Sequence, residues 1–162
     1  MGRQRIAQAF VWLFVVSASL VAGASVFEHI VLTPLWAGSP PESVTQWRYG
    51  GVQGRFFAAV TPFYGLFSLG LLLVVKWTLR RQRRWAAIAA VSGVIVVVWT
   101  IAFFLPILAK TQVRAGAGLT PDEITMLVAR FRLWHWFRAA LLLGGWLAGL
   151  RALSLSPASD PA

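Results

Sequence analysis

Long runs of apolar residues, separated by short polar stretches, dominate the pattern along the chain. A helix needs about 20 such residues to cross ~30 Å of hydrocarbon. Four runs reach this length, at residues 6–32, 56–75, 85–108 and 133–153. The pattern therefore predicts an all-α fold, a membrane four-helix bundle in which residues 1–162 form a single integral membrane domain.

The first run also has features of a cleavable signal peptide. It follows two arginines, Arg3 and Arg5, and it contains small residues at 22–24 that would suit a cleavage site. Because the apolar run continues well past that site, we expect an uncleaved first span.

The connection between the first two runs is predicted to contain a short outer helix. Residues 39–42 read Ser-Pro-Pro-Glu, which has the serine-to-glutamate spacing of a capping box with proline in the first helical turn. We expect a helix over 40–49. Three glycines should then break it before the second span, at Gly50, Gly51 and Gly54.

The same capping signature recurs before the fourth run, at residues 120–123 (Thr-Pro-Asp-Glu). Because no Gly or Pro follows until well inside the run, helix four should extend from Pro121 to about Leu153. Its first turns carry apolar residues at i, i+3, i+4 and i+7 spacing, which should pack on the outer helix as a cap: Ile124, Leu127, Val128 and Phe131.

Composition and charge fit a membrane protein. The chain is 58% apolar and only 12% charged, with no cysteine, which excludes disulfides and thiolate metal sites. The net charge of +10 comes from basic residues at the ends of the apolar runs, so we expect no nucleic acid as partner.

The loop at 80–84 carries four arginines without an acid. The positive-inside rule then places this loop and both termini in the cytoplasm, and membrane lipids are the expected partners.

Ionisable residues occur near the outer ends of the first and fourth spans. Glu28 and His29 lie on the first, and His135 and Arg138 share a face of the fourth. Such groups are costly in a membrane unless they are paired, so a Glu28–Arg138 pair is expected. The pair either locks two helices together or belongs to a functional pocket, which Tyr64 in the second span could also line.

His29 and His135 are the only histidines and are predicted at the same membrane face. A haem or metal site that uses both is an alternative, although their spacing matches no ligand motif. The chain also contains no phosphate-binding glycine loop, nucleophile elbow or carboxylate-rich metal motif, so hydrolase and ATPase functions have no support.

Several short motifs occur in an order that covers nearly the whole chain. They are Gly23-x4-Glu28 followed by Val-Leu-Thr-Pro-Leu-Trp at 31–36, Pro-Glu-Ser-Val at 41–44 with Trp47, Phe104-x-Pro106 as the end of helix three, and Trp134-His135-x2-Arg138. In these motifs the chain resembles the anthrone oxygenase-like family of four-helix membrane proteins, whose bacterial members are mostly uncharacterised.

The resemblance implies a four-helix bundle and, for the characterised members, oxygenation of polycyclic anthrones without a metal or flavin cofactor. It implies His135 as the base, Arg138 as the partner of the oxyanion, and Trp36 and Trp134 as stacking walls. The chain departs from the oxygenase pattern in containing no asparagine. That departure weakens the transfer of the activity more than the transfer of the fold.

These features together predict an outward-facing pocket for a lipophilic aromatic or quinone-like small molecule. The candidate catalytic residues are His135, Arg138 and Glu28, and the candidate ligand-binding residues are Trp36, Tyr64 and Trp134. The alternative is a non-enzymatic structural or accessory membrane protein, in which the charged pair serves only helix packing.

Overall fold

The computed structural model describes residues 2–47 and 50–155, and these residues are all-α, as predicted. The helical elements are α1 (Gly2–Phe27), η1 (Glu28–Leu32), α2 (Thr33–Ala37), α3 (Glu42–Gln46), α4 (Gly50–Val74), η2 (Val75–Trp77), α5 (Arg80–Trp99), η3 (Thr100–Phe104), α6 (Leu105–Leu108), η4 (Ala109–Val113) and α7 (Pro121–Ser154). The segments η1, η3 and η4 are π-helical, and η2 is a 3₁₀ turn.

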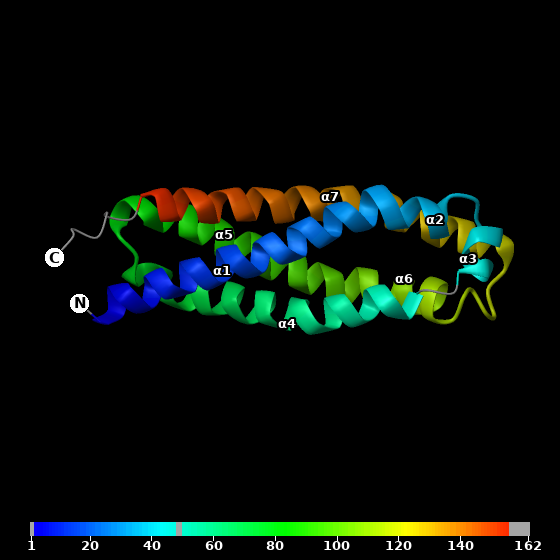
Figure 1. Ribbon diagram of the computed structural model, residues 1–162, viewed down its shortest axis with the longest axis horizontal. Helices are drawn as coiled ribbons and strands as arrows, with labels where there is room; N and C mark the ends of the chain where they lie inside the picture. The colour runs from blue at the N-terminus through cyan, green and yellow to red at the C-terminus, as the bar shows by residue number, and fades with distance from the viewer. Residues whose placement is uncertain (1, 48–49, 156–162) are drawn as a thin grey trace.

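The long helices α1, α4, α5 and α7 run lengthwise side by side (Figure 1). Helix α1 packs on α4 and α7, and α5 packs on the same two helices from the other side. The start of α1, the end of α7 and the α4–α5 connection lie at one end of the bundle (Figure 1). Helices α2 and α3 and the connection into α7 form the opposite end, which we call the outer end.

Three helical runs are long and apolar enough to cross a membrane: Gly2–Ala37, Gly54–Trp77 and Arg80–Val113. They contain the predicted spans 6–32, 56–75 and 85–108, and each is longer than its prediction. The fourth predicted span, 133–153, lies within α7, which does not reach the same apolar average. Two arginines interrupt its apolar residues, Arg138 and Arg151.

The expected end of helix three at Phe104-x-Pro106 is wrong, because the helical run continues to Val113. A proline inside a helix leaves the carbonyl four residues earlier without a donor and crowds it sterically. Here that carbonyl belongs to Ala102, inside the wider π-helical turn η3, which accommodates the proline. The first helical run has the same arrangement, because Pro34 follows the π-helical turn η1.

The outer end has its own apolar core. Helices α2 and α3 contribute Trp36, Ala37 and Val44, and these pack with residues of η3, α6 and α7, namely Phe104, Ile107, Ile124, Val128 and Phe131. This packing confirms the predicted cap over the start of helix four, although η3 and α6 share it with the outer helix.

The outer helix itself is shorter than predicted. Helix α3 begins at Glu42 after Pro41 and has no side-chain cap, and the hydroxyl of Ser43 accepts from the Ser39 N–H at 3.2 Å. It ends at Gln46 because the backbone of Trp47 is extended, and the expected end at Tyr49 lies outside the described residues. The glycine break is also wrong, because α4 begins at the first of the three glycines, Gly50, Gly51 and Gly54.

Helix α7 begins where the sequence predicts. The N–H of Glu123 donates to Thr120 Oγ1 at 3.3 Å, and the N–H of Thr120 donates to Glu123 Oε2 at 2.8 Å. This is a complete capping box.

The hydrogen bonds from the backbone and hydroxyl of Thr120 lower the pKa of the Glu123 carboxyl group. The stabilisation from this carboxylate is therefore present at neutral pH and is lost as the pH falls through the lowered pKa.

Replacement of Thr120 by alanine should destabilise the protein by about 1 kcal/mol, because a first-turn N–H of α7 loses its acceptor. The measurement is thermal unfolding of the purified protein in detergent. Thr125→Ala is the matched control, since the Thr125 hydroxyl only donates to the Pro121 carbonyl one turn earlier. Equal melting temperatures for both variants and the wild type would show that the capping box contributes nothing.

Candidate functional site

A cluster of buried polar side chains joins the first and last long helices near the outer end. Arg138 Nη2 donates to Glu28 Oε2 and to Ser25 Oγ, both at 3.3 Å. All three side chains are buried, with Glu28 only 3% and Arg138 only 6% exposed. The predicted Glu28–Arg138 pair is therefore confirmed.

Helical spacing brings the cluster together. Ser25 and Glu28 are three residues apart across the α1–η1 junction, and His135 and Arg138 are three apart on α7. Each pair therefore shares one helix face. Small residues allow α1 and α7 to approach closely, and a Cβ placed on Gly149 would lie 2.8 Å from Val15.

His135, like Ser25, has no exposed surface. Its Nε2 lies 3.3 Å from the hydroxyl and 3.3 Å from the carbonyl oxygen of Ser25, and 3.9 Å from Glu28 Oε2. Its ring packs against Phe104 and Phe131, with centroids 6.0 and 5.1 Å away. This packing separates the imidazole from any open space.

Arg138 is held between aromatic rings. Its guanidinium carbon lies 4.8 Å from the ring centre of Phe104 and 5.8 Å from that of Phe57, which comes from α4. Its buried Nε has no hydrogen-bond partner. A buried donor without a partner costs about 1–3 kcal/mol, so a ligand that accepts from it would gain affinity.

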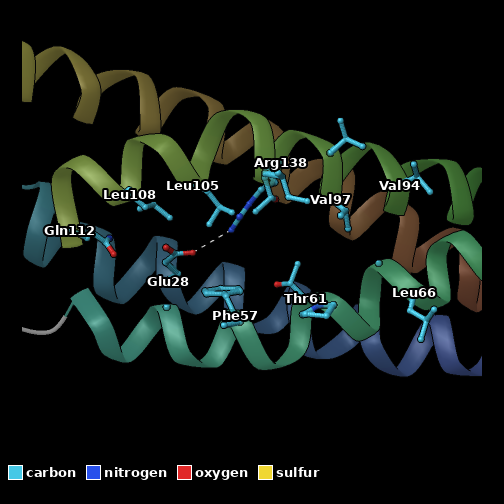
Figure 2. Close-up of a pocket in the computed structure, with 18 of the residues that line it drawn as sticks. Glu28, Phe57, Thr61, Leu66, Val94, Val97, Leu105, Leu108, Gln112 and Arg138 are labelled. Atoms are coloured by element: carbon cyan, nitrogen blue, oxygen red, sulfur yellow. Dashed lines mark hydrogen bonds and ion pairs between the residues drawn. The ribbon is translucent and has the colours of Figure 1, made fainter. Parts of the chain in front are cut away.

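Glu28 and Arg138 lie at the wall of a groove of about 840 Å³. One side of the groove is α4, and the other is the helical run from α5 to η4 (Figure 2). Most of its lining is apolar, including Phe57, Leu66, Val97, Leu105 and Leu108. A groove of this size with few polar groups has the character of a small-molecule site.

The groove contains polar residues that the sequence did not single out. Gln112 lies at one end of it, and its buried Nε2 has no hydrogen-bond partner. Thr61 and Thr100 also line it. Figure 2 shows Glu28 and Arg138 joined by a dashed line at the groove, with Gln112 to one side. Gln112 lies in the π-helical turn η4, beyond residue 108 where the third predicted span ends, so no sequence signal pointed to it.

The predicted ligand-binding residues lie elsewhere. Trp36 packs in the apolar core of the outer end, with its ring centre 5.0 Å from that of Phe131. Tyr64 packs in the core between the long helices, with its ring centre 5.7 Å from that of Phe14. Trp134 contacts Trp99, with ring centres 5.1 Å apart. These three and His135 are absent from the groove lining. Of the six candidate residues, the structure brings only Glu28 and Arg138 to the groove.

The two histidines lie close together near the outer end of the bundle, but their arrangement does not suit a haem. Their ring centres are 5.0 Å apart. Two imidazoles bound to opposite faces of one metal ion, each with a bond of about 2 Å, would hold their ring centres about 6 Å apart. The fully buried His135 ring also leaves no room for a macrocycle. Among the described residues, no three histidines or carboxylates gather as metal ligands.

Similar proteins give no assignment. The chain matches no family model, no curated protein and no solved structure. Any function must therefore be inferred from the groove and the buried pair beside it.

Removal of one partner of the pair should be more harmful than removal of both. Arg138→Met would leave the Glu28 carboxylate buried and unpaired, which costs about 3–5 kcal/mol. The double variant Glu28→Met/Arg138→Met should recover much of that loss. Thermal unfolding in detergent measures both effects, with Arg130→Met at an exposed arginine of α7 as the control. A double variant that loses the sum of both single effects would contradict a coupled pair.

Proposed function

We propose that this protein is an integral membrane protein of four transmembrane helices, with α7 as the fourth and both termini in the cytoplasm. Three helices are long and apolar enough to cross a bilayer, and α7 runs beside two of them. The start of α1 and the end of α7 lie at the same end of the bundle as the arginine-rich start of α5 (Figure 1). The positive-inside rule supports a cytoplasmic position for that end, and a bacterial inner membrane is the proposed location.

The arginine inside α7 is compatible with a membrane span because it does not face lipid. Arg138 is buried between α1, η1 and α4 and is paired with Glu28. Ionisable residues in membrane helices normally face the bundle interior and pair in this way. With 34 residues, α7 is roughly 50 Å long, so it crosses the bilayer and extends beyond it at the outer end.

The topology can be tested with single cysteines, because the chain has none of its own. We expect an exposed cysteine at the outer end, as in Ser39→Cys or Ala117→Cys, to react in intact cells with a membrane-impermeant maleimide. Arg81→Cys should react only after the membrane is disrupted. The reverse labelling pattern would overturn the orientation, and equal labelling of all three sites would argue against four spans.

We further propose that the groove binds a lipophilic aromatic or quinone-like molecule. The observation that carries this proposal is a large apolar groove with one buried, charged and incompletely paired group at its wall. Since the groove lies between two membrane helices, a ligand could enter it from the bilayer. Apolar rings would contact Phe57, Leu105 and Leu108, while Arg138 binds the polar end.

The unpaired groups define the polar part of the ligand. The Arg138 Nε and the Gln112 Nε2 are both N–H donors, so they select oxygen acceptors such as carbonyls. The Glu28 carboxylate is an acceptor and would take a hydroxyl or an acidic C–H proton. A three-ring ketone has these features, and the groove volume is ample for it.

Oxygenase chemistry, which the family resemblance implies, fits this groove only with a changed assignment. Glu28 rather than His135 would remove a proton from the CH₂ group opposite the carbonyl of an anthrone, because only Glu28 lines the groove. Arg138 would stabilise the enolate oxygen. The carbanion would then react with O₂, which takes up four electrons overall, to give the quinone and water.

The ligand proposal can be tested by binding of anthrone and of anthracene to the purified protein. The two molecules share three rings, but only anthrone has a carbonyl. Anthrone should bind more tightly by about tenfold, the effect of one hydrogen bond to a charged donor. Ala58→Trp should abolish binding by filling the groove, whereas Ala59→Trp adds the same bulk outside it. The binding is measured by isothermal titration calorimetry in detergent.

The same variants separate an enzyme from a structural protein. Oxygen consumption with anthrone should disappear in Ala58→Trp and Glu28→Gln and persist in Ala59→Trp. Binding without consumption in the wild type would remove the oxygenase assignment and keep the ligand site. Equal affinity for anthrone and anthracene, unaffected by Ala58→Trp, would leave the Glu28–Arg138 pair with a purely structural role.

A further inference from the structure

A second pocket, of about 430 Å³, lies between the η1–α2 segment and α7. It shares no lining residue with the groove, although Glu28 and His29 are consecutive: Glu28 lines the groove and His29 lines this pocket. The other lining residues are Thr33, Pro34, Ala37, Gly38, Arg132, Leu133 and Trp136. The pocket is therefore a separate site near the outer end of the bundle.

The polar groups of this pocket lack partners. Thr33 is only 3% exposed, yet its Oγ1 has no hydrogen-bond partner. The buried Nδ1 of His29 has none either, and the His29 ring lies 3.9 Å from the ring of Trp136. In a folded protein such buried polar atoms normally have a partner, so these two indicate a polar ligand that completes them.

The charge of the pocket favours an anion. Arg132 lines it as an exposed cation, and no acid is among its lining residues. Thr33 supplies a hydroxyl donor, and His29 supplies a ring nitrogen that donates in one tautomer. An arginine with a hydroxyl and an imidazole beside it is a donor set suited to phosphate oxygens.

The surroundings of the pocket are apolar and exposed. Trp136 is 63% and Leu133 is 69% exposed, and both lie on the same part of α7 as Arg132. An arginine next to an exposed tryptophan and leucine is typical of the membrane interface, where the aromatic ring lies at the headgroup level. Acyl chains could extend over these two side chains.

We propose that this pocket binds the phosphate group of an anionic phospholipid, with Arg132, Thr33 and His29 as its ligands and Trp136 against the glycerol region. The choice of a phosphate group follows from the pocket residues alone. We place this lipid in the outer leaflet of the membrane, and that placement rests on the proposed topology. The lipid would contact both the η1–α2 segment and α7, at residues that the groove does not share.

The experiment is native mass spectrometry of the full-length protein in detergent, titrated with phosphatidylglycerol. Arg132→Gln should weaken binding at least about fivefold, the equivalent of ~1 kcal/mol per basic residue at a membrane surface. Arg130→Gln removes an equal charge from an exposed position outside the pocket and should have no effect. Diacylglycerol, which lacks the phosphate, should not bind.

Thr33→Val separates a ligand contact from a structural role. Valine has the shape of threonine, and replacing an unpaired buried hydroxyl by a methyl group should leave the lipid-free melting temperature unchanged or higher. Phosphatidylglycerol binding should nevertheless weaken. Equal losses in Arg132→Gln and Arg130→Gln, or unchanged binding in both Arg132→Gln and Thr33→Val, would overturn the proposal. Competition by inorganic phosphate at millimolar concentration would assign the pocket to free phosphate instead of lipid.

Discussion

The buried ion pair between Glu28 and Arg138 is the interaction on which the arrangement of the bundle depends. Each charge would cost several kcal/mol if buried alone, and in a bilayer no water is available to replace the missing partner. The pair therefore requires that η1 and α7 lie side by side at one depth. Ser25 and His135 complete its surroundings, so that the polar atoms at this contact are concentrated in one place.

The helical runs beside this pair are not regular α-helices throughout. In the first and third helical runs, a π-helical turn precedes a proline, and the chain continues as a helix instead of ending. Such turns add backbone width and are frequent at functional sites. On the third run they form one wall of the groove, opposite α4, with Arg138 and Glu28 between the two walls (Figure 2). The apolar groove thus borders a charged pair in which the buried Arg138 Nε has no hydrogen-bond partner. A ligand with an acceptor oxygen would remove the free-energy cost of this unpaired donor.

Much of the fold could be predicted from apolar run length and from local capping chemistry. The Thr120–Glu123 box and the spacing behind it were enough to place the start of α7 and its outer core. Predictions from local sequence failed where packing between helices determines the backbone conformation. Pro106 was expected to end a helix, but it follows a π-helical turn and the helical run continues past it. Gly50, Gly51 and Gly54 were expected to break one, and they lie in the first turns of α4.

The candidate site could be predicted only in part, for a related reason. Glu28 and Arg138 were identifiable because unpaired charges in a membrane helix need each other. The aromatic residues Trp36, Tyr64 and Trp134 carry no such requirement, and packing placed them in cores away from the groove. Gln112 was overlooked because it lies in η4, beyond residue 108 where the third predicted span ends.

The central claim is that the groove beside the Glu28–Arg138 pair holds a lipophilic molecule with an acceptor oxygen. The most direct measurement is an experimental density map of the protein purified from its own membrane in mild detergent. The account predicts planar density between α4 and the α5–η4 run, with an oxygen in contact with Arg138. A map with only acyl chains in the groove, or with the groove closed and Arg138 in contact with Glu28 and Ser25 alone, would contradict it.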